Sequence, residues 1–292
     1  MRLSVRSFAW CLMLVASSLP RGVARTQPAQ PQLPRAPIAR GFPASADVTM
    51  RIYIPAGRLR LSVWARDSIH VRGTLGDAAA FFGGGSRTHV KLGVEPKVTG
   101  DTRLPEVDWE VSVPRGARVW VKMIDGEIDA TGTTGELELY TVRGQITVRD
   151  VAGVTSIESI DAAVTVRRAR GDLRVRGSRG AVVLDDVKGT VSVATVSGPV
   201  SLTGVVADGR VETIGGGIAF TGGSLGGAML ELQSHAGAIT LSLDAKRAPL
   251  LDLSSRAGPV QGSQVVGAKA HGQLVARSFK GRISVRTTPV TP

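Results

Sequence analysis

The feature that most constrains the fold is a glycine that returns every nine residues through the middle of the chain. In the stretch GELELYTVRGQITVRDVAG, residues 135–153, glycine stands at positions 135, 144 and 153. Rows of 18 residues align two such columns, half a row apart: Gly126, Gly144, Ala162, Gly180, Gly198 and Gly216 in one, and Gly135, Gly153, Gly171 and Gly189 in the other. Repetition at a short fixed period is typical of coils that stack on one another.

Apolar residues follow these glycines at fixed distances. Two and four residues after the first column stand pairs such as Ile128 and Ala130 or Val164 and Val166. After the second column the apolar residues are Leu139, Ile157, Val175, Val193 and Val211, with Val142, Ile160, Val196 and Ile214 three residues later. Alternation predicts strands with one buried face, and glycine predicts the corners between them.

The predicted fold is therefore all-β: a single-stranded parallel β-solenoid of about 18-residue coils over residues 117–288. Equivalent residues would form internal ladders about 4.8 Å apart. The usual handedness of parallel connections favours right-handed coiling. Gly237, Gly258 and Gly281 continue the rhythm at the wider intervals of 21, 21 and 23 residues, so we expect longer loops there, DAKRAPL at 244–250 among them.

Residues 47–116 share the β character but not the period, and we interpret them as a β-rich N-terminal cap. The segment DVTMRIYIPAGRLRLSV alternates, breaks at Pro55 to Gly57 and resumes at Leu59, which indicates a hairpin or strand pair. An open solenoid end exposes unpaired backbone, which is why a cap is needed. Residues 289–292 form a short tail.

The N-terminus has the features of an export signal. Arg2 and Arg6 precede the apolar run FAWCLMLVASSL, which is too short for a membrane span, and small residues follow at 22–24. We predict cleavage after Ala24, which removes Cys11 and lowers the net charge from +12 to about +9. The mature chain would have no thiol and no transmembrane segment, and would lie in the periplasm, on the outer cell surface or in the medium. Residues 25–46, rich in Pro, Gln and Ala, are predicted to be an extended linker.

The run WEVSVPRGARVWVKMIDGEIDATGTTGELELYTVRGQITV, residues 109–148, resembles the adhesin-like β-strand repeat family, an exported bacterial domain of unknown function. The family shares an extended strand that ends in Pro-x-Gly, followed by short strand repeats with glycine at the breaks. The resemblance covers residues 47 to about 288. It implies the fold and an adhesin-like role, and it implies no catalytic residue.

No constellation of residues indicates catalysis, a cofactor or a metal. The histidines at 70, 89, 235 and 271 have no ligand or catalytic partner at a suitable spacing, so we expect surface or loop positions. Calcium needs six to eight oxygens, and the turns lack a repeating aspartate. Asp125, Glu127 and Asp129 could suggest the paired carboxylates of a glycosidase, but in the predicted register they are outward residues that flank Ile128.

The richest basic stretch, VRRARGDLRVRGSRG, has six arginines between 167 and 179 and suggests an anionic envelope or surface polymer as partner. In rows of 18, however, Arg168 stands between Asp150 and Asp186, and other arginines alternate with acids in the same way. Much of the cluster would then be paired within the stack. Arg170, Arg174 and Lys188 are the least compensated residues and form the candidate polyanion-binding set.

Aromatic residues are few. Beyond Trp120 the repeats contain only Tyr140, Phe220 and Phe279, so flat platforms for sugars or unpaired bases are not expected, and specific nucleic-acid binding is disfavoured. Three functions stay open at this point. The first is an adhesin-like scaffold that binds a macromolecule at the cell envelope. The others are a purely structural envelope protein and a polysaccharide-processing β-helix enzyme.

Overall fold

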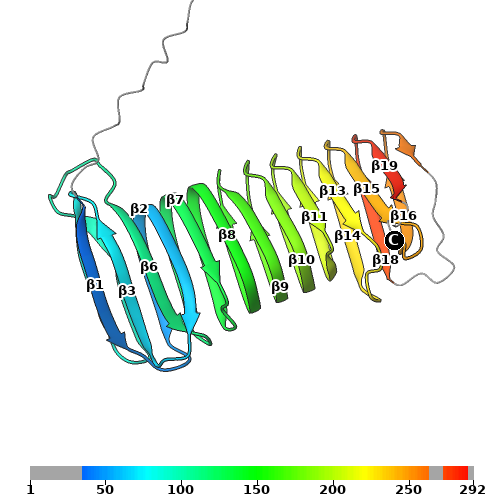
Figure 1. Ribbon diagram of the computed structural model, residues 1–292. Coiled ribbons are helices and arrows are strands. Elements are labelled where there is room, and N and C mark those ends of the chain that lie inside the picture. Colours follow the sequence, from blue (N-terminus) through cyan, green and yellow to red (C-terminus); the bar gives the residue numbers. More distant parts are fainter. Residues whose placement is uncertain (1–34, 263–271, 289–292) are drawn as a thin grey trace, which may run out of the picture. The chain divides into compact units, whose positions relative to one another are not determined.

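The computed structural model describes residues 35–262 and 272–288. Nineteen strands join in one sheet, and the chain runs through successive coils that lie side by side (Figure 1). No helix occurs among these residues, and hence none that is long and apolar enough to cross a membrane. The predicted all-β class is confirmed. The predicted signal peptide and tail lie outside the described residues.

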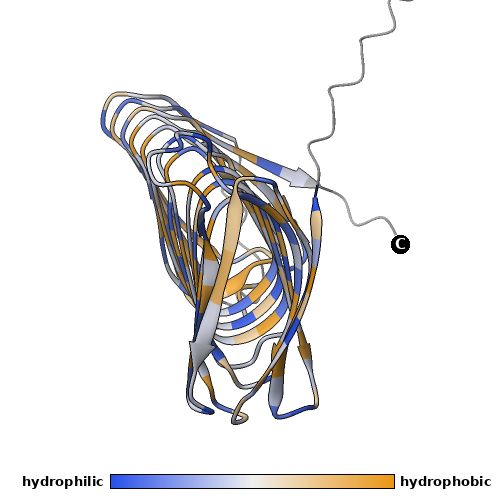
Figure 2. Cartoon of the chain, turned by 90° about the vertical axis from the view of Figure 1, so that its left-hand side faces the viewer, coloured by the Kyte–Doolittle hydropathy of each residue, from blue (hydrophilic) through white to orange (hydrophobic). Residues whose placement is uncertain are grey.

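The middle coils have strict parallel register. Each residue lies opposite the one 18 positions further on, so that Ile146 lies opposite Val164 and Val164 opposite Val182. The inward side chains, Val148 and Val166 among them, are fully buried, and apolar and polar residues alternate along the coils (Figure 2). The strands of this region are β7 (Arg118–Thr131), β8 (Glu136–Ser159), β9 (Ala163–Arg176) and β10 (Val182–Thr195).

Glycine is required at the corners because neighbouring coils approach closely there. Gly144 has φ +110°, and a Cβ at this position would lie 1.9 Å from the carbonyl oxygen of Gly126 in the coil before. A Cβ at Gly180 would lie 1.8 Å from the carbonyl oxygen of Ala162. Both glycine columns predicted from the sequence stack as expected.

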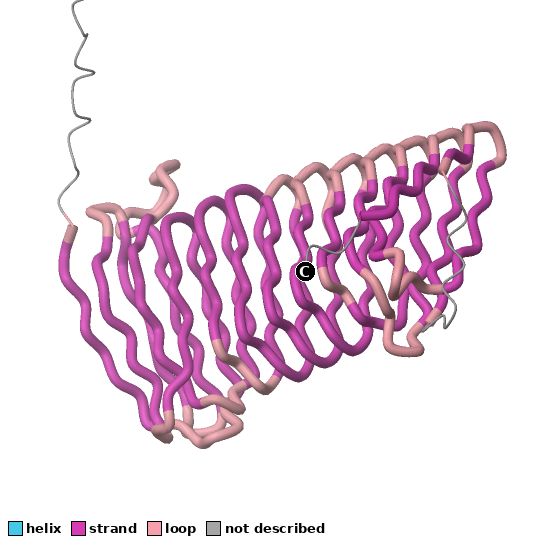
Figure 3. Tube along the Cα trace, turned by 45° about the vertical axis from the view of Figure 1, so that its right-hand side comes forward, coloured by secondary structure: helices cyan, strands magenta, loops and turns pink. Residues whose placement is uncertain are grey.

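Shorter strands continue the stack, two to a coil. β11 and β12 both pair with β10, and β13, β14 and β15 each pair with the strand two positions before. Figure 3 shows the loops that separate these half-coils. The strands are β11 (Val200–Thr203), β12 (Val206–Thr213), β13 (Ile218–Gly222), β14 (Met229–Ser234) and β15 (Ile239–Asp244).

At the C-terminal end the order of the coils in space differs from their order in the chain. β14 and β15 pair with β18 (Gln273–Ser278) and β19 (Ile283–Thr288), whose other edges pair with β16 (Leu250–Ser255) and β17 (Val260–Gln261). The last coil of the chain therefore lies between two earlier ones (Figure 1). The glycine rhythm at 237, 258 and 281 gave no sign of this exchange.

The last coil is more deeply buried than the coil outside it. Ile283 is fully buried between two layers, whereas Val260, at the equivalent place in the outer coil, is 46% exposed. Leu274 is likewise buried, and its register partner Leu251 is only half-buried. In β19 the inward Ile283 and Val285 are larger than Val260 and Gly262 of the outer coil, whereas in β18 Leu274 and Ala276 are not larger than Leu251 and Leu253.

The N-terminal strands correct three predictions. Residues 36–43, part of the predicted linker, form a strand that pairs antiparallel with β3, because Ile38 is buried and the backbone is paired throughout. Residues 49–64 form one long strand rather than a hairpin, since Gly57 is a coil corner opposite Gly126. Parallel stacking accordingly begins at β2, before the predicted boundary at residue 117. The strands are β1 (Ala36–Pro43), β2 (Thr49–Trp64), β3 (Ser68–Leu75), β4 (Ala79–Gly85), β5 (His89–Pro96) and β6 (Glu106–Pro114).

These strands close the first coil: β5 and β6 pair parallel with β2, and the strands beyond them are added by antiparallel pairs. The second half of β2 pairs with β6, which continues to β3 and β1. The first half of β2 pairs with β5, which continues to β4. The region therefore has the position expected of a cap.

One apolar row that the pattern placed inside lies outside. Ile160, Val196 and Ile214 are 42%, 48% and 58% exposed. The residue before each is a buried hydroxyl that serves the corner: Thr195 Oγ1, for example, donates to the carbonyl of Gly198 at 3.0 Å. Because the hydroxyl points inward, the next side chain points to solvent.

Candidate binding surface

The predicted pairing of charges between coils is present. Arg168 donates to both carboxylate oxygens of Asp150, at 2.6 and 2.8 Å, and these hydrogen bonds lower the pKa of Asp150. Arg179 is held in the same way by Asp161. Asp186 corrects the prediction, because its carboxylate contacts Lys188 at 3.6 Å instead of Arg168.

Backbone conformation explains why this column is so regular. Asp150, Arg168 and Asp186 have φ values of 55°, 53° and 51°, and they are the described non-glycine residues with positive φ. The left-handed conformation is costly for such residues, and Asp is among those that tolerate it best. Its repetition in three successive coils places the side chains of the column in equivalent positions.

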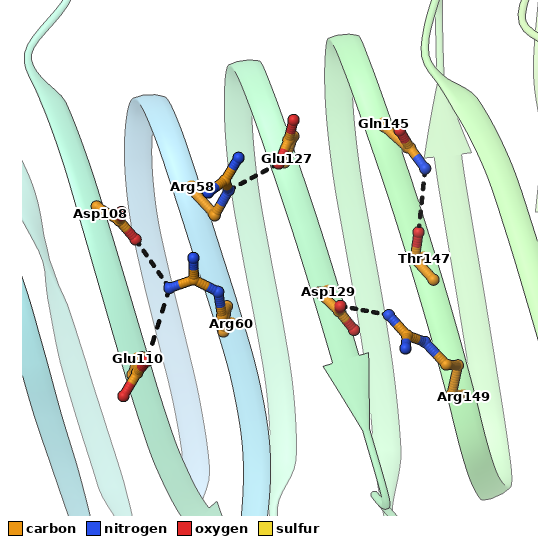
Figure 4. A network of polar contacts seen from close by, with 9 residues as sticks. All are labelled: Arg58, Arg60, Asp108, Glu110, Glu127, Asp129, Gln145, Thr147 and Arg149. Atoms are coloured by element: carbon orange, nitrogen blue, oxygen red, sulfur yellow. Dashed lines mark hydrogen bonds and ion pairs between the residues drawn. The ribbon is translucent and has the colours of Figure 1, made fainter.

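The carboxylates of DGEID lie outward beside buried Ile128, as predicted, and each contacts an arginine. Figure 4 shows two of the pairs, Glu127 with Arg58 and Asp129 with Arg149. Glu127 accepts from Arg58 at 2.7 Å and Asp129 from Arg149, while Asp125 contacts Arg143 at 3.0 Å. Within residues 35–262 and 272–288, no group of three His, Cys, Asp or Glu side chains could hold a metal ion.

The three candidate polyanion-binding residues do not form one patch. Arg170 and Lys188 are register partners in β9 and β10. Arg174 lies beyond the corner at Gly171, and its register partners are Ser156 and Ser192, as predicted. Binding of an anionic polymer by Arg170, Arg174 and Lys188 stays a prediction.

The structure brings together an aromatic surface that the sequence did not predict. Tyr53, Phe82, Trp120 and Tyr140 share one outward face of the first coils, although they come from four strands. The rings of Tyr53 and Trp120 are 5.1 Å apart. Sequence reasoning counted aromatic residues only within the regular repeats, where they are rare. The sequence alone does not show that β2 pairs with β5 and β7, and this pairing brings the rings together.

Lysine side chains cover some of these rings. Lys91 Nζ lies 5.1 Å from the ring centre of Tyr53 and 5.6 Å from that of Phe82. Lys122 Nζ lies 5.6 Å from the ring centre of Tyr140. Such cation–π contacts fix the lysines on the surface.

Two hollows lie on this surface and share Trp120 and Glu138 as lining residues. The first, of about 460 Å³, is also lined by Arg51, Tyr53 and Glu136. The second, of about 220 Å³, is also lined by Tyr140 and Glu158. Burial and the nearby Glu136 carboxylate raise the pKa of Glu138. We call Tyr53, Trp120, Glu136, Glu138 and Tyr140 the Trp120 surface.

A larger groove, of about 690 Å³, lies along the corner further down the stack. Its lining includes Arg176, Phe279 and two residues of the outward apolar row, Val196 and Ile214. The ring of His235 stacks on Phe279 at 4.9 Å. His70 and His89 are likewise at or near the surface, as expected, and His271 lies outside the described residues.

Comparison with known proteins identifies the family of the chain. A proposed adhesin from Bacteroides fragilis is 8% identical with a TM-score of 0.38, and the match covers 86% of this chain and 97% of that one. A proposed lipid-binding protein from Parabacteroides distasonis is 12% identical with a TM-score of 0.38, and the coverage is 87% and 97%. No curated protein matches the chain. The profile of the Toastrack DUF4097 family matches residues 38–281, and the chain belongs to this family, a domain of unknown function.

Proposed function

We propose that the chain is an exported, non-catalytic β-solenoid scaffold that binds a macromolecule at the cell envelope or cell surface. The coils, of about 18 residues, would wind right-handed. The N-terminal segment, with its short apolar run and small residues before position 25, supports export. Adhesin-like binding is the role in which a long, rigid stack with outward side chains in fixed rows is most useful.

The Trp120 surface is the observation that carries this proposal. Most outward charges of the middle coils are paired within the stack, as Arg168 and Arg179 show. The outward aromatic side chains of the Trp120 surface contact one another and two lysines, and in addition they line two hollows. Half-exposed Trp and Tyr are enriched where proteins contact their partners, because they combine a large apolar area with a polar group.

A binding role also fits the carboxylates better than catalysis does. The outward acids of DGEID are bound to arginines. Glu136 and Glu138 share one strand and lie on the same face, whereas the two acids of a glycosidase flank the scissile bond.

Retention on cell envelopes tests the proposal. We would incubate the exported chain with envelopes of the source cells and with unrelated surfaces, for wild type and for Trp120→Ala. Trp64→Ala is the matched control, because Trp64 is half-buried like Trp120 but lies away from both hollows, where it contacts Arg66. We expect Trp120→Ala to lose retention and Trp64→Ala to keep it. A wild-type chain that no envelope retains would indicate a purely structural protein, and turnover of a polysaccharide would indicate an enzyme.

A further inference from the structure

The chemistry of the two hollows beside Trp120 limits what they can bind. Each combines an aromatic ring with carboxylates, Glu136 and Glu138 in the first and Glu138 and Glu158 in the second. A sugar ring presents an apolar C–H face to an aromatic side chain and a rim of hydroxyl groups to hydrogen-bond acceptors. Carboxylates accept such hydrogen bonds strongly because they are charged.

We infer, on the basis of the proposed function, that the Trp120 surface binds an uncharged linear polysaccharide, with sugar rings in the hollows on both sides of the indole. Trp120 would supply the stacking face for both hollows. Glu138, which lines both, would accept hydroxyl hydrogen bonds from adjacent sugars. Arg51 and Lys122, one in each hollow, would donate to hydroxyl or ring oxygens.

The charges argue against a polyanion at this place. A phosphate or uronate in either hollow would lie within a few ångströms of a carboxylate, and like charges 4 Å apart repel by about 1 kcal/mol in water and about 4 kcal/mol near a protein surface. The cations that line the hollows, Arg51 and Arg118 in the first and Lys122 in the second, do not outnumber the two carboxylates in each. Single-stranded nucleic acid, which aromatic and cationic grooves often bind, is disfavoured for the same reason.

The arrangement of the hollows indicates a ligand that runs along the stack. The two hollows adjoin each other at Trp120, so one sugar cannot occupy both of them and a chain of sugars can. The second hollow also leads toward the corner groove: Glu158 lines the former, Arg176 lines the latter, and the two are register partners in adjacent coils. Binding should therefore strengthen as the oligosaccharide grows from one sugar to several.

The test uses the exported chain and defined probes. Neutral linear glucans, mannans, galactans and chitin oligomers, each as a series from one to six sugars, would be titrated while tryptophan fluorescence is recorded. Heparin, alginate and oligothymidylate are the anionic probes. We expect at least one neutral series to bind with affinity that rises with length, and Trp120→Ala to weaken that binding about tenfold. Trp120→Phe should restore part of it, and Trp64→Ala should leave it unchanged, with equal unfolding midpoints for all variants.

The outcomes separate this inference from the proposed function. Envelope retention that depends on Trp120, without binding of any neutral series, would overturn the polysaccharide and leave the scaffold function. Preferential binding of heparin, alginate or oligothymidylate at the Trp120 surface would also overturn it. Absence of envelope retention together with Trp120-dependent glycan binding would reject the envelope role and support the polysaccharide.

Discussion

The middle coils and the two ends of the stack follow different rules. Between β7 and β10 each residue repeats the environment of the residue 18 positions before it, and outward charges pair from coil to coil. At the N-terminal end, β2 and β4, which lie outside the repeat, place Tyr53 and Phe82 beside Trp120 and Tyr140 of the first regular coils. At the C-terminal end the last coil is inserted between two others. Repetition thus fixes the packing, and the specific features of this chain lie where repetition stops.

The largest expected effect separates the buried middle from the exposed end. Val166→Asp places a charge in a fully buried ladder, whereas Val260→Asp places one at a side chain that is 46% exposed in the outermost coil. We expect a loss of about 4 kcal/mol or more in the free energy of unfolding for Val166→Asp. Val260→Asp should cost less than about 1 kcal/mol. Denaturant unfolding of both variants measures the difference, and equal losses would mean that the ladder register is wrong.

A second pair of substitutions sharpens the comparison within the C-terminal end. Leu274 and Leu251 are register partners of the same residue type, the first buried in the inserted coil and the second half-buried in the outer coil. Leu274→Ala should cost about 2 to 5 kcal/mol, and Leu251→Ala markedly less, because a cavity forms only at the enclosed site. If the coils were stacked in chain order, Leu251 would be the enclosed residue and the ranking would be reversed.

A smaller effect concerns the charges of the middle coils. Arg168→Glu places three acids in one column, Asp150, residue 168 and Asp186, whereas Arg174→Glu faces only Ser156 and Ser192. We expect the unfolding midpoint to fall by about 2 °C for Arg168→Glu and to change little for Arg174→Glu. Retention on an anionic matrix is measured on the same samples. Equal midpoints with equally lost retention would favour a polyanion patch over paired charges.

Strongly acidic pH should abolish the effect that loss of Arg168 has on the unfolding midpoint. Hydrogen bonds from Arg168 hold the pKa of Asp150 below its usual value, so its contribution to stability is present above the unfolded-state pKa of about 3.9 and is lost as the pH falls through the folded-state pKa. The midpoints of wild type and Arg168→Gln should therefore converge at strongly acidic pH. A constant difference at all pH values would show that the ion pair is not its cause.

The smallest effect concerns Glu138 of the Trp120 surface. Burial and Glu136 raise the pKa of Glu138, so the charged form of Glu138 is disfavoured in the folded state, and its contribution declines as the pH rises through the folded-state pKa. Glu138→Gln should stabilise the chain at neutral pH by no more than about 0.5 kcal/mol, since solvent screens the site. The gain should vanish in acid. A loss of stability at neutral pH would show that the carboxylate is held by an attractive contact instead.

Periodicity in the sequence predicts what depends on the repeat alone. The glycine corners, the burial of Val166 and the neighbours of Arg174 followed from rows of 18 residues. The outward position of Val196 did not, because Thr195 bonds to the corner and an alternating pattern does not distinguish a hydroxyl that points inward from one that points outward.

The ends could not be predicted for a different reason. Trp120 and Tyr53 are 67 positions apart, and only the pairing of β2 with β7 brings their rings together. The coils that contain Val260 and Ile283 both fit the repeat, so the pattern defines the form of each coil and leaves their order open. The sequence offered basic residues of one segment, such as Arg170, as candidates for binding. The pairing of the strands instead brings together Trp120 and Tyr53.

Disulfide trapping tests the exchanged order of the coils most directly, because Cys11, in the predicted signal peptide, is the only native cysteine. Gln233 and Arg277 are register partners, and Ser254 lies one coil further on, opposite Arg277. Adjacent strands are about 4.8 Å apart, within the range of a disulfide, whereas a two-coil separation of about 10 Å is not. The structure predicts a disulfide for Gln233→Cys with Arg277→Cys and none for Gln233→Cys with Ser254→Cys. The opposite result would place the coils in chain order and contradict the fold described above.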